Sequence, residues 1–207
     1  MAKQPSDPRR LYQFDAEWRA EAPRLCGVDE AGRGPLCGPV AVAAVILDPD
    51  TLLEGLDDSK KLNEARREAL YQRITETAIA WQVVLVPPRQ IDELNILQAT
   101  LLGMRLAVEG LATTPDCVLV DGDKTPRLPQ RCVAVTKGDA QSACIAAASV
   151  LAKVTRDRHM VELDKQYPQY ALAQHKGYPT KLHYELLEQH GLQPFYRKSF
   201  LKKRGLA

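Results

Sequence analysis

The sequence predicts an α/β fold in which helices pack around a central sheet. Short apolar runs rich in valine and alanine alternate along the 207 residues with longer stretches whose apolar residues recur at helical spacing. Hydrophobic residues make up 45% of the chain and charged residues 26%, which are ordinary values for a globular protein. A chain of this length can bury a core without disulfides or a structural metal. We therefore expect one main α/β domain.

Five apolar runs are the predicted strands. They cover residues 25–29, 39–47, 82–86, 117–120 and 132–135. The short glycine-containing link between the first two favours antiparallel neighbours.

Four stretches predict helices. Asn63 is a suitable N-cap for the first, which should run to about Ala80. Seven apolar residues on one stripe predict a single helix over about 91–111. The alanine-rich stretch 142–154 predicts a helix packed tightly on the sheet, with 156–158 marking its emergence into solvent. Thr180 should cap a last helix that ends before Gly191.

The two ends of the chain are polar. Residues 1–23 are punctuated by proline and predict a loosely held extension with a helical turn around 17–21. Residues 197–204 carry five basic side chains and no acid, which is typical of a solvated end or of a phosphate-contacting arm.

Cysteine usage and the N-terminus bear on the compartment. The five cysteines form no C-x-x-C pair, which argues against a zinc site and a disulfide framework. The N-terminus has no apolar signal segment, and no apolar run approaches the roughly 18 residues that span a bilayer. We expect a cytoplasmic protein in a reducing compartment.

Acidic residues follow three of the five predicted strands. These are the pair Asp29 and Glu30, then Asp121, then Asp139. Each one alone could merely start a turn, but ligands of α/β sheets gather at strand ends, so three such ends suggest convergence. Clustered carboxylates repel unless a cation neutralises them, and an all-oxygen ligand set suits Mg²⁺ or Mn²⁺. Two such ions about 3.5–4 Å apart form the usual clamp for in-line attack on a phosphodiester.

The adjacent acids pose a geometric question. Neighbouring side chains of a strand point to opposite faces, so Asp29 and Glu30 cannot serve one site from a straight strand. If Asp29 points into the site, Glu30 must reach it by a bend or serve it from the rim. Gly32 and Gly34 can supply the bend and admit a close approach to the backbone.

Six motifs in order along the chain resemble the ribonuclease HII family. They are GVDEAGRGPL at 27–36, DSKKL at 58–62, VDG at 120–122, KGD at 137–139, AASVLAK at 147–153 and HKGYPT at 175–180. The resemblance implies a ribonuclease H-like fold with a central mixed five-stranded sheet flanked by helices and a C-terminal helical appendage. It divides the chain into an N-terminal extension (1–23), a catalytic core (24–160) and a helical, basic segment on the substrate side (161–207).

The resemblance also implies an activity. It implies a metal-dependent endoribonuclease that hydrolyses the RNA strand of RNA–DNA hybrids and cuts on the 5′ side of single ribonucleotides in duplex DNA, as in ribonucleotide excision repair. The matched acids Asp29, Glu30, Asp121 and Asp139 would bind Mn²⁺ or Mg²⁺ and form the catalytic site. Because metal-activated water attacks, the 2′-OH is read but is no nucleophile, and the products carry 5′-phosphate and 3′-hydroxyl ends.

Substrate contacts follow from the same motifs. The backbone of Gly32, Arg33 and Gly34 and the ring of Tyr178 would read the ribose 2′-OH, the group that separates RNA from DNA. Six further residues are candidate phosphate contacts, which position a duplex without reading sequence: Ser59, Lys60, Lys61, Lys153, Lys176 and Lys181. For any lysine alone, a solvated surface position is the simpler interpretation.

Three other functions stay open at this point. A phosphotransferase or nucleotidase would be expected to have a phosphate-cradling loop such as G-x-x-x-x-G-K-[ST], and the sequence has none. A metal-free ribonuclease would need paired histidines, and the four histidines are His159, His175, His183 and His190. The last alternative is a non-catalytic module that binds RNA–DNA hybrids. We expect a monomer, and a replication-clamp or other repair partner is left open.

Overall fold

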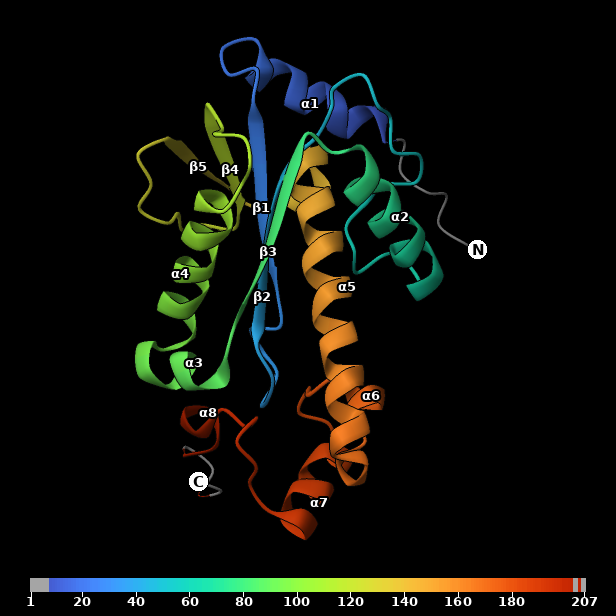
Figure 1. The fold of residues 1–207 in the computed structure, drawn as a ribbon, viewed down its shortest axis with the longest axis vertical. Coiled ribbons are helices and arrows are strands. Elements are labelled where there is room, and N and C mark those ends of the chain that lie inside the picture. The colour runs from blue at the N-terminus through green and yellow to red at the C-terminus, as the bar shows by residue number, and fades with distance from the viewer. Residues whose placement is uncertain (1–7, 203–204, 206–207) are drawn as a thin grey trace.

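The fold is known from a computed structural model that describes residues 8–202 and residue 205, and in this range five strands form one mixed sheet (Figure 1). The strands are β1 (Leu25–Ala31), β2 (Val40–Ile46), β3 (Ala80–Val86), β4 (Cys117–Asp121) and β5 (Arg131–Val135). Their order is β3-β2-β1-β4-β5, with β1 parallel to β4, β4 parallel to β5, and the remaining neighbours antiparallel. The predicted α/β class and mixed five-stranded sheet are confirmed.

Helices cover both faces of the sheet (Figure 1). On one face lie α5 (Ala143–Gln166) and, beside it, α2 (Glu64–Thr77). On the other lie α3 (Pro88–Leu94) and α4 (Ile96–Glu109). The alanine-rich part of α5 brings its backbone unusually close to β1, because a Cβ on Gly27 would lie 2.1 Å from the carbonyl carbon of Cys144. Small residues on both elements therefore set this contact.

The predicted single helix over 91–111 is wrong, because α3 and α4 are separate helices. Asn95 between them has a φ of 70°, a conformation that asparagine tolerates better than most residues. Its side-chain oxygen accepts hydrogen bonds from Leu97 N at 3.0 Å and Gln98 N at 3.1 Å, so it caps α4. The apolar stripe continues across the break, and periodicity alone could not reveal it.

The N-terminal extension is more ordered than predicted. Helix α1 spans Arg9–Arg19 rather than 17–21, and residues 1–7 lie outside the described residues. Asp15 of α1 is fully buried, and its carboxylate accepts a hydrogen bond from Cys144 N, in the first turn of α5, at 2.9 Å. A carboxylate at a helix N-terminus accepts a hydrogen bond from an otherwise unpaired N–H group and interacts favourably with the helix dipole. Thus α1 stabilises the start of the helix that packs on β1.

The C-terminal part forms the lower end of the molecule in Figure 1. It contains the end of α5, α6 (Leu172–His175), α7 (Lys181–His190) and α8 (Lys198–Lys202). Thr180 caps α7 through a hydrogen bond from His183 N at 3.2 Å, as predicted. A β-bridge between Cys37 and Tyr196 ties this part to the loop after β1.

Two arginines contradict the sequence prediction. Arg156 was expected to emerge into solvent with α5, and Arg197 to begin a solvated basic end, but their exposed fractions are 1% and 0%. Lys198 and Lys202 are exposed, and Lys203 and Arg204 lie outside the described residues. Across the part of the chain that the structure describes, no helix combines the length and apolarity needed to cross a membrane.

Candidate active site

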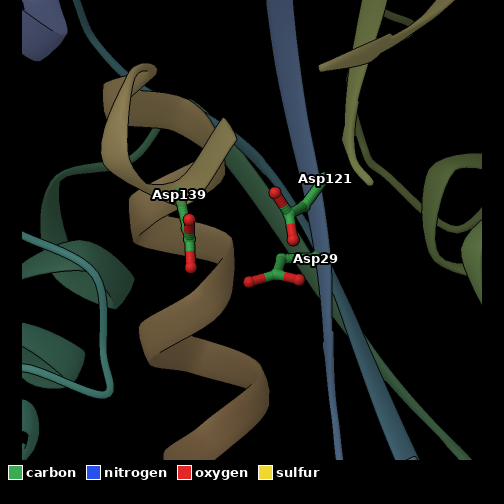
Figure 2. Close-up of side chains that lie close together, drawn as sticks. All are labelled: Asp29, Asp121 and Asp139. Carbon is green, nitrogen blue, oxygen red and sulfur yellow. The ribbon is translucent and has the colours of Figure 1, made fainter. Parts of the chain in front are cut away.

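Three aspartates from three elements meet on the α5 side of the sheet (Figure 2). Asp29 lies on β1, Asp121 ends β4, and Asp139 lies in the short 3-10 turn Gly138–Ala140 that leads into α5. One carboxylate oxygen of each lies within 4.8 Å of the others. The parallel register pairs Val28 with Val120, so the next residue on each strand, Asp29 and Asp121, lies at the same edge. The predicted convergence of strand-end acids is confirmed for these three.

Backbone hydrogen bonds orient the acids before any ligand binds. Gly138 N donates to Asp121 Oδ1 at 2.7 Å, which joins the end of β4 to the turn that carries Asp139. Glu30 N donates to Asp29 Oδ1, also at 2.7 Å. Each bond holds one carboxylate oxygen and leaves the second free to face its neighbours.

The electrostatics of the group call for a cation. Asp29 is 3% exposed, and burial raises its pKa well above the usual value, with the charges of Glu30 and Asp121 adding to the effect. Lys60 Nζ lies 3.2 Å from Asp139 Oδ2, but its side chain is 75% exposed. Buried carboxylates without histidine or cysteine fit a hard divalent cation. Asp29, Asp121 and Asp139 are therefore the residues that would hold one.

Glu30 lies outside the group of three. Strand alternation puts its side chain on the face opposite Asp29, and it forms an ion pair with Arg33 Nη1 at 3.5 Å. Burial raises the pKa of Glu30, Arg33 lowers it, and the charge of Asp121 raises it again, so Glu30 senses the site from its rim. Direct metal binding by Glu30 stays a prediction. Asp123, by contrast, is 81% exposed and faces Lys124.

The loop that follows β1 lies against the loop of Tyr178, and we call the exposed surface between Gly34 and Tyr178 the notch. Gly32 has a φ of 93°, and a Cβ there would lie 1.9 Å from Arg156 Nε, so glycine is required twice over. Gly34 is exposed, and a Cβ on it would lie 4.0 Å from Cε1 of Tyr178, whose side chain is 41% exposed. The hydrogen bond from Leu36 N to Gly177 O, 2.8 Å long, joins the two loops. Gly34 and the Tyr178 ring thus lie side by side at this exposed surface.

The family model for ribonuclease HII matches residues 26–203, which is most of the chain. The chain belongs to the ribonuclease HII family. It is accordingly a divalent-metal-dependent endoribonuclease of the ribonuclease H type.

Curated and solved relatives agree with this placement. The ribonuclease HII of Vibrio vulnificus is 58% identical over 176 residues, covering 85% of each chain. Ribonuclease H2 of Pyrococcus horikoshii superposes with a TM-score of 0.75 at 28% identity, covering 88% of this chain and 96% of its own. The Archaeoglobus fulgidus ribonuclease HII, solved in complex with PCNA, gives 0.68 at 28% identity over 84% and 93% of the chains. The ribonuclease H-like fold is therefore confirmed.

The phosphate candidates of this ribonuclease HII differ in their surroundings. Ser59 is buried and accepts a 2.6 Å hydrogen bond from Ser149 Oγ, so it fixes its loop to α5. Lys60 reaches the acidic group through Asp139. Lys153 Nζ pairs with Asp157 Oδ1 at 2.8 Å and lies over the Tyr178 ring, 6.0 Å from its centroid. Among these candidates, Lys60 thus lies beside the acids and Lys153 beside the notch.

The remaining lysines make local contacts. Lys61 Nζ pairs with Asp57 Oδ1 at 2.9 Å, and Lys176 Nζ donates to Ala173 O at 2.6 Å. Lys181 is 91% exposed and lies 3.6 Å from Glu185. Their phosphate contacts stay predictions.

Two histidines do meet, but in the interior. The rings of His175 and His183 stack with centroids 4.0 Å apart. Gly177 N donates to His175 Nδ1, so the ring proton lies on Nε2, which donates to Tyr170 O at 2.8 Å. His183 donates from Nδ1 to Tyr178 O at 2.9 Å and accepts at Nε2 from the Tyr196 hydroxyl at 3.1 Å.

Both rings are therefore neutral and fully engaged. Burial lowers the pKa of His183 to about 4. This argues against a metal-free mechanism through paired histidines and gives His183 a supporting position behind Tyr178. The sequence motif identified the loop but not this packing.

Proposed function

We propose that this ribonuclease HII hydrolyses the RNA strand of RNA–DNA hybrids and cuts on the 5′ side of single ribonucleotides in duplex DNA. The observation that carries the proposal is the meeting of Asp29, Asp121 and Asp139 within 4.8 Å at the strand that leads into the exposed Gly34 backbone, which faces the Tyr178 ring. A cluster of carboxylates that holds divalent cations is suited to phosphodiester hydrolysis. An exposed tyrosine beside accessible backbone groups is suited to recognition of a 2′-OH.

Each residue has a separate task in this proposal. Asp29, Asp121 and Asp139 hold a divalent cation, Mn²⁺ or Mg²⁺, and Glu30 adds negative charge from the rim. A bound ion supplies an activated water and stabilises the leaving oxygen. The Gly32–Gly34 backbone and Tyr178 select the ribose, while Lys60 and Lys153 receive the phosphates on either side.

Cleavage of a labelled DNA duplex that holds one ribonucleotide tests the proposal. Incubation with Mn²⁺ or Mg²⁺ should give one cut on the 5′ side of the ribonucleotide, and EDTA should abolish it. The matched substrate with deoxyribose at that position should remain intact. Cleavage that persists in EDTA, or that ignores the ribose, would contradict the proposal.

The product ends test the attacking group. Because water attacks, the 3′ fragment should carry a 5′-phosphate and the 5′ fragment a 3′-hydroxyl that a polymerase extends. A 2′,3′-cyclic phosphate would show instead that the 2′-OH is the nucleophile.

We further infer that residues 161–207 form the wall of the site on the substrate side. We also infer that the protein acts as a monomer and that it is located in the cytoplasm. Tyr178 belongs to this segment, and every proposed site residue comes from one chain. The five cysteines are free, which suits a reducing compartment. Light scattering after size exclusion should give a mass near 23.0 kDa. A clamp partner is suggested only by the complex of the Archaeoglobus relative.

A further inference from the structure

Arg197 holds the glycine-rich loop after β1, residues 32–38, from its buried side. Its guanidinium is fully buried and donates to four backbone carbonyls of this loop: Gly32 O at 2.7 Å, Arg33 O at 3.0 Å, Pro35 O at 2.9 Å and Gly38 O at 2.9 Å. No carboxylate is hydrogen-bonded to it within the described chain. Four of its five N–H donors are thus spent on the shape of one loop.

The direction of these bonds determines where the loop amides point. Across a trans peptide the carbonyl oxygen and the next N–H lie on opposite sides of the chain. When Arg197 draws the carbonyls of Gly32 and Arg33 inward, the N–H groups of Arg33 and Gly34 must turn outward. Both residues are exposed, and within residues 8–202 their N–H groups have no protein acceptor.

Arg156 ties this loop to the tyrosine loop. From α5 its guanidinium donates to Cys37 O at 3.2 Å and Pro39 O at 3.0 Å on one side, and to Lys176 O at 3.0 Å on the other. It also lies 5.9 Å from the centroid of the Tyr178 ring. The two arginines therefore fix both walls of the notch.

Two buried cations side by side are costly, which implies a use. Burial and the charge of Arg156 together lower the pKa of Arg197 to about 9, and burial also lowers the pKa of Arg156. A guanidinium nevertheless stays protonated at neutral pH. A lysine could not replace either, because a compact ammonium cannot span several carbonyls as a planar fork does. Their positive charge also lies behind the surface that, in the proposed function, receives the anionic backbone of the substrate.

We propose that Arg197 is a positioning residue for ribose recognition, which turns the amides of Arg33 and Gly34 toward the 2′-OH and the adjacent phosphate while Arg156 holds Tyr178 opposite them. This inference rests on the proposed function, because it names how the notch of that site is built. It does not involve the three aspartates or the cation they would hold.

Binding measured without cleavage tests the inference. In EDTA, the affinity of the wild type for a duplex with one ribonucleotide should exceed its affinity for the all-deoxy duplex by up to about tenfold, since both duplexes carry the phosphate and only the hydrogen bond to the 2′-OH distinguishes them. In Arg197→Lys this ratio should fall to within about twofold of unity. Arg105→Lys, on the far face of the sheet, should keep the wild-type ratio and serves as the matched control.

Two outcomes separate the inference from the proposed function. If the wild type discriminates and Arg197→Lys discriminates equally well, the positioning role is wrong while the function stands. If the wild type neither discriminates nor cleaves, the proposed function itself fails. A folded Arg197→Lys should keep the thermal stabilisation by Mn²⁺ of the wild type, which a general structural defect would not.

A measurement on the unaltered protein covers the case in which Arg197→Lys does not fold. In NMR spectra of protein labelled with ¹⁵N-arginine and ¹⁵N-glycine, the amide signals of Arg33 and Gly34 should shift on adding the ribonucleotide duplex, and less with the deoxy duplex. If neither amide distinguishes the two duplexes, the inference is overturned.

Discussion

The acidic group and the arginine-held loop are neighbours with opposite electrostatics. Asp29, Asp121 and Asp139 bring like charges together, and the cation that pairs with them, Lys60, has a largely exposed side chain. Arg156 and Arg197 also bring like charges together, but carbonyl oxygens surround both guanidinium groups. A divalent cation would balance the charges of the first arrangement, whereas carbonyl oxygens of the chain itself satisfy the second.

In the proposed function, the acidic group carries out the hydrolysis and the arginine-held loop recognises the ribose. A group that needs a cation can change its occupancy with conditions, whereas a loop held by four hydrogen bonds keeps its shape. Substitutions in the acidic group should therefore alter turnover and leave ribose selection intact. Substitutions of the arginines that hold the loop should instead weaken ribose selection and leave the acidic group intact.

The largest effect is expected for Asp121→Asn. Loss of one ligand charge should reduce cleavage of the ribonucleotide duplex by about 10³-fold, because the bound ion supplies several kcal/mol to the reaction. The ratio of ribo to deoxy affinity should stay at the wild-type value. Steady-state cleavage and EDTA binding assays measure the two quantities.

Asp123→Asn is the matched control for that change. It removes an exposed carboxylate two residues away, and its cleavage rate should stay within about twofold of the wild type. Should Asp121→Asn retain a tenth of the activity, the acidic group would not be the catalytic centre.

The free energy of unfolding should depend on pH through His183, which lies behind Tyr178. The pKa of His183 is lowered from 6.5 to about 4, so the folded state resists protonation while the unfolded state accepts it. His183 therefore contributes stability above pH 6.5, and this contribution is lost as the pH falls toward 4. The loss should be on the order of 3 kcal/mol, at about 1.4 kcal/mol per pKa unit.

Urea unfolding at several pH values, in wild type and His183→Gln, isolates this contribution. The difference between the two proteins should shrink as the pH falls from 6.5 to 4. His190→Gln, in the same helix α7, controls for the loss of a histidine. A difference that is constant over this range would show that the buried ring is not protonation-sensitive.

Asp29→Asn should stabilise the metal-free protein by on the order of 1 kcal/mol. Burial and neighbouring charges raise the pKa of Asp29, so the folded state favours its protonated form, and ionisation costs stability as the pH rises past that value. Asparagine removes the charge and keeps the oxygen that accepts from Glu30 N.

Thermal unfolding with EDTA and with Mn²⁺ checks this prediction. The variant should melt above the wild type in EDTA and gain less from Mn²⁺. Lower stability of the variant in EDTA would mean that the acidic group is not strained without a cation.

The smallest effect is expected for Lys181→Ala. Its side chain is almost fully exposed and pairs only with Glu185, so it can contribute one phosphate contact at most. Affinity should fall about equally for ribo and deoxy duplexes, and the salt slope of binding should decrease by about one. A selective loss for the ribo duplex would place Lys181 on the recognition side.

Local patterns predicted the acidic group better than its surroundings. Asp29, Asp121 and Asp139 were found because each follows an apolar strand, and parallel strands bring such ends together. The glycine turn after the first strand marked Gly32, and the resemblance of the 175–180 motif to the family marked Tyr178. These features depend on neighbours in the chain and on one rule of sheet geometry.

Features that depend on distant packing were missed. Arg197 follows Phe195 and Tyr196, but its burial depends on a loop more than 150 residues earlier. Arg156 has polar neighbours on α5 and so resembled a solvent-facing residue. No local pattern distinguishes an arginine that meets water from one that meets backbone carbonyls, because both need only donors.

The close backbone contact between β1 and α5 has a consequence for the position at which the nucleic acid is cut. From Gly27 to Gly32 the strand advances about 17 Å, and from Cys144 to Arg156, its contacts on the helix, α5 advances about 18 Å. Asp29 lies between these two contacts, three residues or about 10 Å before Gly32, so the packing of α5 fixes the separation between the acids and the notch. If both act as proposed, the incision should fall at one constant offset from the ribonucleotide whatever bases surround it.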